Sequence, residues 1–292
     1  MYLIYSPKFL EHYQGSLHPE SPERLIEING YLNKRMKYSA IEARPVNEKD
    51  LNLVHSIAHI EAIKKYSAAG ANFPDNKFSR NTFEIAKLTC GAALNAAQMA
   101  ILKRKFAFAL VRPPGHHAGK DFFGGFCYFN NLALAVRKLK KRTLVLDIDA
   151  HHGNGTQDIF YEDKNVFYAS LHQHPATSFP GTGYEKENNE HVLNVPLEPN
   201  TDDKTYLEEL KKTIEKVKKA KFVPQLVAIS IGFDSYIDDK VANLDIKDTK
   251  TYFKIGERID KSFSCPKFAC LEGGYYLPKL GEMVYNFLRA FK

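Results

Sequence analysis

The chain has 292 residues, of which 44% are hydrophobic and 26% are charged, as in an ordinary globular protein. Its net charge of +7 attracts anions, but its lysines alternate with acids along helical stretches, so no specific nucleic-acid partner is expected. The start of the chain is too weakly apolar for a secretory leader, and no run reaches about 18 apolar residues, so no membrane partner is expected. The four cysteines form no CxxC pair, which favours free thiols and a cytoplasmic location.

Short apolar runs alternate with longer stretches of helical composition along the chain. The runs expected to be strands cover residues 2–5, 106–111, 143–148, 166–171, 226–231 and 268–271. Residues 83–105 and 205–221 have helical composition. Nearly all the strands are continuously apolar, as in a parallel sheet covered on both faces. The sequence therefore predicts an α/β fold, a three-layer αβα sandwich with a mostly parallel central sheet, in one domain over residues 1–292.

Titratable side chains follow four of these runs. Ligands of open parallel sheets bind beyond the carboxyl ends of the strands, so these positions are candidates for function. The four segments are RPPGHHAG, DAHHGNGTQ, GFDSY and EGGYY. Such groups at four separate strand ends indicate a site at one edge of the sheet.

The second of these segments contains a candidate metal site. Asp147, Asp149 and His151 are two residues apart, so in an extended chain all three point to one side and could converge on a cation. Asp234 offers a further carboxylate after a buried apolar run, where an unpaired charge would be very unfavourable. Three protein ligands with an open position are typical of catalytic zinc, and the same ligand types also suit Fe²⁺, Co²⁺ or Mn²⁺.

Acid–base chemistry is indicated by an adjacent histidine pair, His116 and His117. Asp147 and Asn154 could each accept one ring N–H, and a carboxylate and an amide would give the two imidazoles different basicities. Tyr275 lies behind two glycines, on a loop expected to be flexible, and its phenol could donate a hydrogen bond to an oxyanion. Together these groups predict metal-assisted hydrolysis of an acyl bond.

Seven motifs resemble those of the histone deacetylase and acetylpolyamine amidohydrolase family, in the same order. They are HPESPERL, RPPGHHA, GGFCYFNN, LDIDAHHGNGTQ, SFPGTG, GFDS and LEGGYY. The resemblance covers nearly the whole chain and is strongest to the class II microbial branch. It implies the arginase- and deacetylase-like sandwich. It also implies zinc-dependent removal of an acetyl or other acyl group from acyl-lysine or a related small acylated amine, which would be the partner of the chain.

The resemblance also implies roles for the residues at the strand ends. Zinc would be bound by Asp149, His151 and Asp234. His117, backed by Asn154, would act as general base and then as general acid. His116, paired with Asp147, would be mainly an electrostatic partner, and Tyr275 would polarise the scissile carbonyl.

A tunnel and a second cation are implied in the same way. Phe126 and Phe179 would form the tunnel walls, Gly125 would leave room at its floor, and Asp75 would hold the substrate backbone at the rim. Structural potassium would be bound by Asp147 and Ser170 side chains with the backbone carbonyls of Asp149, His151 and Leu171.

The position of Val241 bears on substrate choice. Polyamine-specific members of the family carry an acidic residue there, so valine disfavours strict polyamine selectivity, although Asp238 and Asp239 lie nearby in sequence. His55 and His59 have the i, i+4 spacing of helical metal ligands, but no third ligand accompanies them, so helix-capping or packing roles are expected.

Two other functions remain open at this point. An arginase-like ureohydrolase would need two manganese ions and more bridging aspartates than this chain supplies. A non-catalytic module that binds acyl-lysine or nucleic acid would be expected to lack Tyr275 or a zinc ligand, and the chain retains both.

Overall fold

The computed structural model describes residues 1–291, and its centre is one eight-stranded sheet. The strand order is β2-β1-β3-β8-β7-β4-β5-β6, and every pairing between these strands is parallel. The strands are β1 (Tyr2–Tyr5), β2 (Ser39–Glu42), β3 (Ala107–Ala109), β4 (Thr143–Asp147), β5 (Val166–Gln173), β6 (Val192–Leu197), β7 (Leu226–Ile231) and β8 (Lys267–Leu271). All carboxyl ends therefore lie at one edge.

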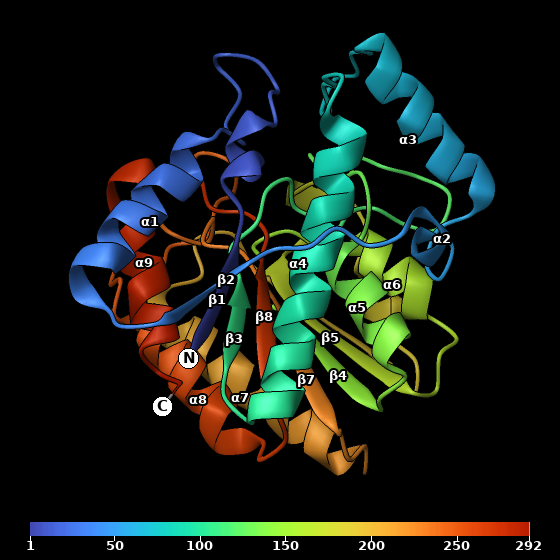
Figure 1. Cartoon of the computed structure of the whole chain (residues 1–292). Helices are drawn as coiled ribbons and strands as arrows, with labels where there is room; N and C mark the ends of the chain where they lie inside the picture. The colour runs from blue at the N-terminus through green and yellow to red at the C-terminus, as the bar shows by residue number, and fades with distance from the viewer. Residues whose placement is uncertain (292) are drawn as a thin grey trace.

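Helices cover both faces of this sheet. Figure 1 shows α4 and α5 in front of the strands and α7 and α8 behind them. The helices are α1 (Glu23–Arg35), α2 (Glu48–Leu51), α3 (Ile57–Ala69), α4 (Thr82–Lys103), α5 (Asn131–Leu139), α6 (Asn154–Phe160), α7 (Asp203–Lys219), α8 (Thr251–Ser262) and α9 (Leu277–Leu288). The predicted three-layer αβα sandwich is confirmed.

The helices follow their sequence patterns. In α7 the buried residues include Tyr206, Leu210 and Val217, which share one helix face, while the lysines stay on the other. The side chain of Asp202 caps the helix by accepting from the Thr205 N–H at 2.9 Å.

By length and composition α4 could cross a membrane, but 67% of its apolar window is buried inside the protein, as expected of a core helix.

Two strands, β2 and β6, were not predicted from the sequence, and both lie at the edges of the sheet. The residues of β2 are largely exposed, so they do not form an apolar run. In β6 the apolar pattern is interrupted by Asn194 and Pro196, and proline is tolerated at a sheet edge because one side of the strand needs no partner. Central strands such as β4 and β7 are wholly buried, and their predicted bounds agree to within one residue.

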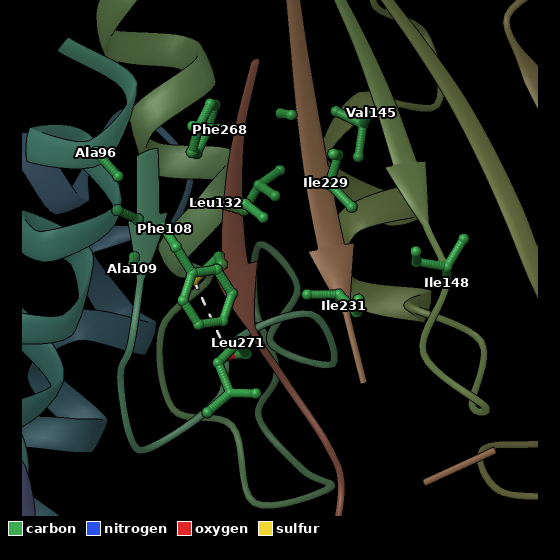
Figure 2. Close-up of a cluster of buried hydrophobic side chains, with 14 of the residues drawn as sticks. Ala96, Phe108, Ala109, Leu132, Val145, Ile148, Ile229, Ile231, Phe268 and Leu271 are labelled. Atoms are coloured by element: carbon green, nitrogen blue, oxygen red, sulfur yellow. Dashed lines mark hydrogen bonds between the residues drawn. The ribbon is translucent and has the colours of Figure 1, made fainter. Parts of the chain in front are cut away.

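The core lies directly beneath the strand ends that carry the candidate site. Figure 2 shows Phe108 of β3 and Phe268 of β8 beside Leu132 of α5, with Ile231 and Leu271 at the ends of their strands. All five are fully buried, and each large apolar side chain contributes roughly 1.5–3 kcal/mol of burial free energy. The loops that begin after Ile231 and Leu271 therefore start from fixed positions.

Candidate active site

The three predicted metal ligands meet at the carboxyl edge of the sheet. Asp149 and His151 follow β4, and Asp234 follows β7, the strand paired with β4. The Nδ1 atom of His151 lies 2.9 Å from Asp234 Oδ2 and 3.2 Å from Asp149 Oδ1. All three side chains are buried, and one donor atom from each lies within 4.8 Å of the others.

Backbone hydrogen bonds orient the two carboxylates. Asp149 Oδ2 accepts from the N–H of Gly273 at 2.8 Å, and Asp234 Oδ1 accepts from the N–H of Ala150 at 3.1 Å. The other oxygen of each carboxylate faces the imidazole of His151. Asp149 Oδ1 also accepts from the backbone N–H of His151 at 2.9 Å, so one oxygen of each carboxylate is held beside this imidazole.

The imidazole of His151 is oriented in the same manner. Its Nε2 lies 3.1 Å from the carbonyl oxygen of Val241, to which it can donate, and this leaves Nδ1 for a metal ion. Burial lowers the pKa of His151, but its hydrogen bonds with Asp149 and Asp234 and their charges outweigh burial and raise it well above 6.5. Two buried carboxylates that face one nitrogen are unfavourable unless a positive charge lies between them. The donor set therefore fits a divalent cation with three protein ligands.

The two histidines of the HH pair have different partners. His116 Nδ1 lies 3.2 Å from Asp147 Oδ2, whereas His117 Nδ1 lies 2.8 Å from Asn154 Oδ1. The two rings lie 4.0 Å apart, centre to centre, and both are buried. The structure thus pairs each histidine with the partner that was predicted for it.

Their environments separate their pKa values. Burial lowers the pKa of His116, but the charges of Asp149 and Asp147 outweigh it and raise that pKa to about 10. Burial lowers the pKa of His117 well below 6.5, and the positive charges of His116 and His151 lower it further. His117 is therefore neutral. When its Nδ1–H donates to Asn154, its Nε2 is left as a proton acceptor.

Tyr275 lies on the irregular segment between β8 and α9. The two glycines are needed here for steric and backbone reasons. A Cβ at Gly273 would lie 2.5 Å from Asp234 Oδ2, and Gly274 has a φ of +111°, which favours glycine. The guanidinium of Arg24 lies 4.7 Å from the centre of the Tyr275 ring. Burial raises the pKa of Tyr275 well above 10, so the phenol keeps its proton.

These groups surround one cavity of about 170 Å³. Its lining residues are Asp75, Pro114, His116, His117, Gly125, Phe126, Asp149, His151, Phe179, Val241, Gly273 and Tyr275. All four predicted substrate-binding residues lie in this wall, and Asp75 is exposed to solvent. A narrow cavity with metal ligands and aromatic walls fits an extended acylated chain better than a bulky ligand.

The aromatic walls are closely fitted. The ring centre of Phe179 lies 4.9 Å from that of His117. A Cβ at Gly125, which has a φ of +50°, would lie 2.3 Å from His117 Cδ2 and 2.8 Å from Phe179 Cε1. Phe126 has a φ of +69°, which side-chain-bearing residues rarely adopt, and its ring lies 5.8 Å from the Tyr275 ring. The missing side chain of Gly125 and the unusual backbone of Phe126 thus keep the space between the aromatic rings open for a substrate.

Part of the predicted potassium site lies on adjacent strands. Asp147 of β4 is the register partner of Ser170 of β5, and Leu171 follows directly. Asp147 is fully buried; its Oδ1 lies 3.3 Å from the N–H of Asp149, and its Oδ2 faces His116. The hydroxyl of Ser170 lies 2.7 Å from His172 Nδ1, so the structure brings these residues to neighbouring strands without joining the two side chains directly.

Several residues that support this site were missed by sequence reasoning. Glu272 is fully buried and accepts from the N–H groups of Gly115 at 2.7 Å and His116 at 3.1 Å, so it fixes the histidine segment. It follows an apolar strand, which is the signal that identified Asp234. Arg24 had no such signal, because its partners come from residues almost at the other end of the chain.

The histidines of α3 and the preceding turn lie outside the site. His55 accepts from the N–H of Asn130 at 2.9 Å through Nε2, and its Nδ1 lies 2.7 Å from the carbonyl oxygen of Gly119. The Nε2 of His59 lies 2.9 Å from the carbonyl oxygen of Tyr128. Both side chains are buried, and these contacts are those of packing histidines.

Comparison with known proteins identifies the family. The model of the histone deacetylase domain matches residues 18–291. The chain belongs to this family. Its members are hydrolases that act on amide bonds, so the predicted family and the predicted class of enzyme are both confirmed.

Individual relatives cover most of the chain. A probable deacetylase of Archaeoglobus fulgidus is 34% identical over 293 residues, covering 94% of this chain and 80% of the relative. The acetylpolyamine amidohydrolase of Mycoplana ramosa is 36% identical over 229 residues, covering 75% of this chain and 66% of the relative. The crystal structure of the HDA15 HD domain superposes with a TM-score of 0.92 at 30% identity, covering 99% of this chain and 90% of that one.

Proposed function

We propose that the chain is a zinc-dependent amidohydrolase that removes an acetyl or other acyl group from acyl-lysine or a related small acylated amine. One observation carries this proposal: His117, whose Nδ1 lies 2.8 Å from Asn154 Oδ1, lines the same narrow cavity as two of the three converging metal ligands and Tyr275. A proton acceptor, a metal site and a neutral proton donor are the groups that hydrolysis of an unactivated amide requires.

Asp149, His151 and Asp234 would hold the zinc ion. When bound, zinc polarises a carbonyl and lowers the pKa of water to about 7. The same donors would accept Fe²⁺ or Co²⁺. We also propose a structural potassium ion near Asp147 and Ser170, with carbonyl groups of Asp149, His151 and Leu171 as further ligands; the buried carboxylate of Asp147 supports it.

The protein groups would act in a fixed order. The acylated chain would lie between Phe126 and Phe179. His117 Nε2 takes a proton from the attacking water, while the Tyr275 hydroxyl donates a hydrogen bond to the carbonyl oxygen as it gains negative charge. His117 then gives the proton to the leaving amine. His116 stays protonated beside Asp147, and its positive charge keeps the pKa of His117 low.

The cavity wall bears on substrate choice. Val241 lines it without charge, Asp238 is exposed, and Asp239 is buried, with its carboxylate bonded to backbone N–H groups. A polyamine would therefore find no buried acid at the position of Val241, which supports a substrate other than a polyamine. An acyl-lysine, whose backbone N–H could donate to the exposed Asp75 at the rim, suits the cavity better.

The rival functions have less support. A ureohydrolase requires a two-metal cluster, and within residues 1–291 Asp149, His151 and Asp234 are the one group of His, Cys, Asp or Glu positioned for a metal ion. A non-catalytic module has no need of a neutral base and a protonated phenol in one cavity.

We also propose a reducing, cytoplasmic location for the chain. The four cysteines are all free, which supports this proposal.

A substrate panel tests the proposal. The zinc-loaded full chain is assayed with acetyl-lysine peptides, longer acyl-lysine peptides and acetylpolyamines, beside Tyr275→Phe and the neighbouring control Tyr276→Phe. We expect release of the free amine from an acyl-lysine peptide, a loss of about 100-fold in kcat for Tyr275→Phe, and near wild-type activity for Tyr276→Phe. Cleavage of none of these substrates by the wild-type chain would refute the proposal.

A further inference from the structure

We propose that Asp239 is a positioning residue that holds the loop of Tyr275 at the cavity wall; this inference rests on the function proposed above. Asp239 is not one of the residues that line the cavity, and only 3% of the residue is exposed. Its carboxylate instead joins two segments of the wall that are distant in sequence, the one before Val241 and the one that carries Tyr275.

The carboxylate accepts three backbone hydrogen bonds. Asp239 Oδ2 lies 2.6 Å from the backbone nitrogen of Tyr275 and 3.1 Å from that of Tyr276. Asp239 Oδ1 lies 3.1 Å from the backbone nitrogen of Val241. Both oxygens are therefore used by N–H donors, and two of those donors belong to the catalytic tyrosine and its neighbour.

The loop needs such a partner because it has no regular structure. Residues 272–276 lie between β8 and α9, and buried N–H groups that lack a partner are strongly unfavourable. Arg24 holds the carbonyl oxygen of Glu272 at 2.5 Å and that of Gly274 at 2.7 Å. Asp239 is the complementary acceptor, so the buried guanidinium of Arg24 binds the carbonyls of this loop and the buried carboxyl group of Asp239 binds its amides.

The same two segments also meet through their side chains. Tyr236 and Tyr276 stack with ring centres 5.5 Å apart and an angle of 23° between their planes. The N–H of Asp239 donates to the carbonyl oxygen of Tyr236 at 2.9 Å. The Asp239 turn is therefore itself ordered, and it can fix the position of the Tyr275 ring rather than follow it.

The variant Asp239→Asn removes one of the two acceptor oxygens of Asp239, and its capacity for negative charge, without changing the size of the side chain. In Asp239→Asn one carboxylate oxygen becomes an NH₂ group, which only donates, so in either orientation a donor faces a backbone N–H donor. Because Val241 accepts from His151 through its carbonyl oxygen, a metal measurement must accompany the kinetics. Asp238→Asn, at the exposed acid next in sequence, is the matched control.

The experiment uses the zinc-loaded full chain and the acylated amine that the wild type cleaves best. We expect Asp239→Asn to lower kcat by about 10- to 100-fold, as displacement of a catalytic group does. We expect KM to change by less than about threefold and zinc content to stay at the wild-type value. Hydrogen exchange of residues 273–276 should become faster, and Asp238→Asn should match the wild type in all four measurements.

A double variant separates positioning from general damage. If Asp239 acts through Tyr275, adding Asp239→Asn to Tyr275→Phe should lower kcat by less than about threefold, because the hydroxyl to be positioned is already absent. An unchanged kcat in the single variant, a full additional loss in the double variant, or loss of zinc would overturn the proposal.

The remaining outcomes are also decisive. Asp239→Ser keeps a smaller acceptor and serves as a second variant; if neither it nor Asp239→Asn accumulates as folded protein, Asp239 is a folding residue and the proposal is wrong. If the wild-type chain cleaves no acylated amine, the proposed function fails instead, and the exchange rates of residues 273–276 alone then show whether Asp239 holds the loop.

Discussion

The imidazole of His117 is bonded to the amide of Asn154, with 2.8 Å between Nδ1 and Oδ1, whereas neighbouring His116 faces a carboxylate. An amide orients the ring without adding negative charge, so burial and the positive charge of His116 keep the pKa of His117 low. This difference makes one histidine a neutral base and the other a cation.

Asn154→Asp should therefore shift the pH dependence of activity. A carboxylate beside His117 stabilises the protonated imidazole, which raises its pKa, so the base form is lost at a higher pH. We expect the acidic limb of the kcat/KM profile to move upward by about one unit or more. An acidic limb at the wild-type position would contradict the assignment of His117 as the base.

Gly125→Ala tests the shape of the tunnel. The added Cβ would lie 2.3 Å from His117 Cδ2 at a φ of +50°, so we expect a loss of about 100-fold in kcat/KM and about 1–3 kcal/mol of stability. Gly124→Ala is the matched control, because its Cβ would meet nothing nearer than Phe179 Cζ at 4.0 Å. Equal activities of the two variants would show that the contact at Gly125 is unimportant.

Glu20→Gln should reveal a buried charge network. Burial raises the pKa of Glu20, but Arg112 and Arg24 outweigh it and lower the pKa to about 2. Arg112 Nε lies 2.8 Å from Glu20 Oε1, and both side chains are fully buried. Because the folded pKa is below the unfolded one, the carboxylate contributes stability above about pH 4.5, and this contribution is lost as pH falls toward 2.

We therefore expect Glu20→Gln to lose about 3–5 kcal/mol at pH 7, measured by urea unfolding, with a smaller loss below about pH 4. Exposed Glu23→Gln should change stability by less than about 0.5 kcal/mol. A pH-independent difference between Glu20→Gln and the wild type would exclude a stabilising charged carboxylate at this position.

Metal removal should affect stability as well as activity. Chelation removes the ion that Asp149, His151 and Asp234 would share, so we expect a lower Tm and loss of amide hydrolysis. Zinc at about 100 times its Kd should restore about 2.7 kcal/mol. Asp234→Asn should bind zinc more weakly and show a smaller shift in Tm. A chelated chain with unchanged Tm and activity would contradict the metal site.

The fold and much of the site could be predicted because buried parallel strands leave a strong pattern. Asp234 and Tyr275 each follow an apolar run, so their common edge was visible in the sequence. The edge strands β2 and β6 left no such pattern, being exposed or interrupted. Arg24 and Asp239 act on backbone groups of residues 272–276, and these partners exist only once the chain has folded.

Hydrolysis of an acylated amine at the site of the single metal ion is tested most directly with labelled water. The zinc-loaded chain is incubated with an acetyl-lysine peptide in ¹⁸O-water, and the products are analysed by mass spectrometry. We expect free lysine peptide and acetate with one ¹⁸O atom, and neither product with His117→Ala. Absence of labelled acetate from the wild-type chain, or its equal formation by His117→Ala, would contradict this expectation.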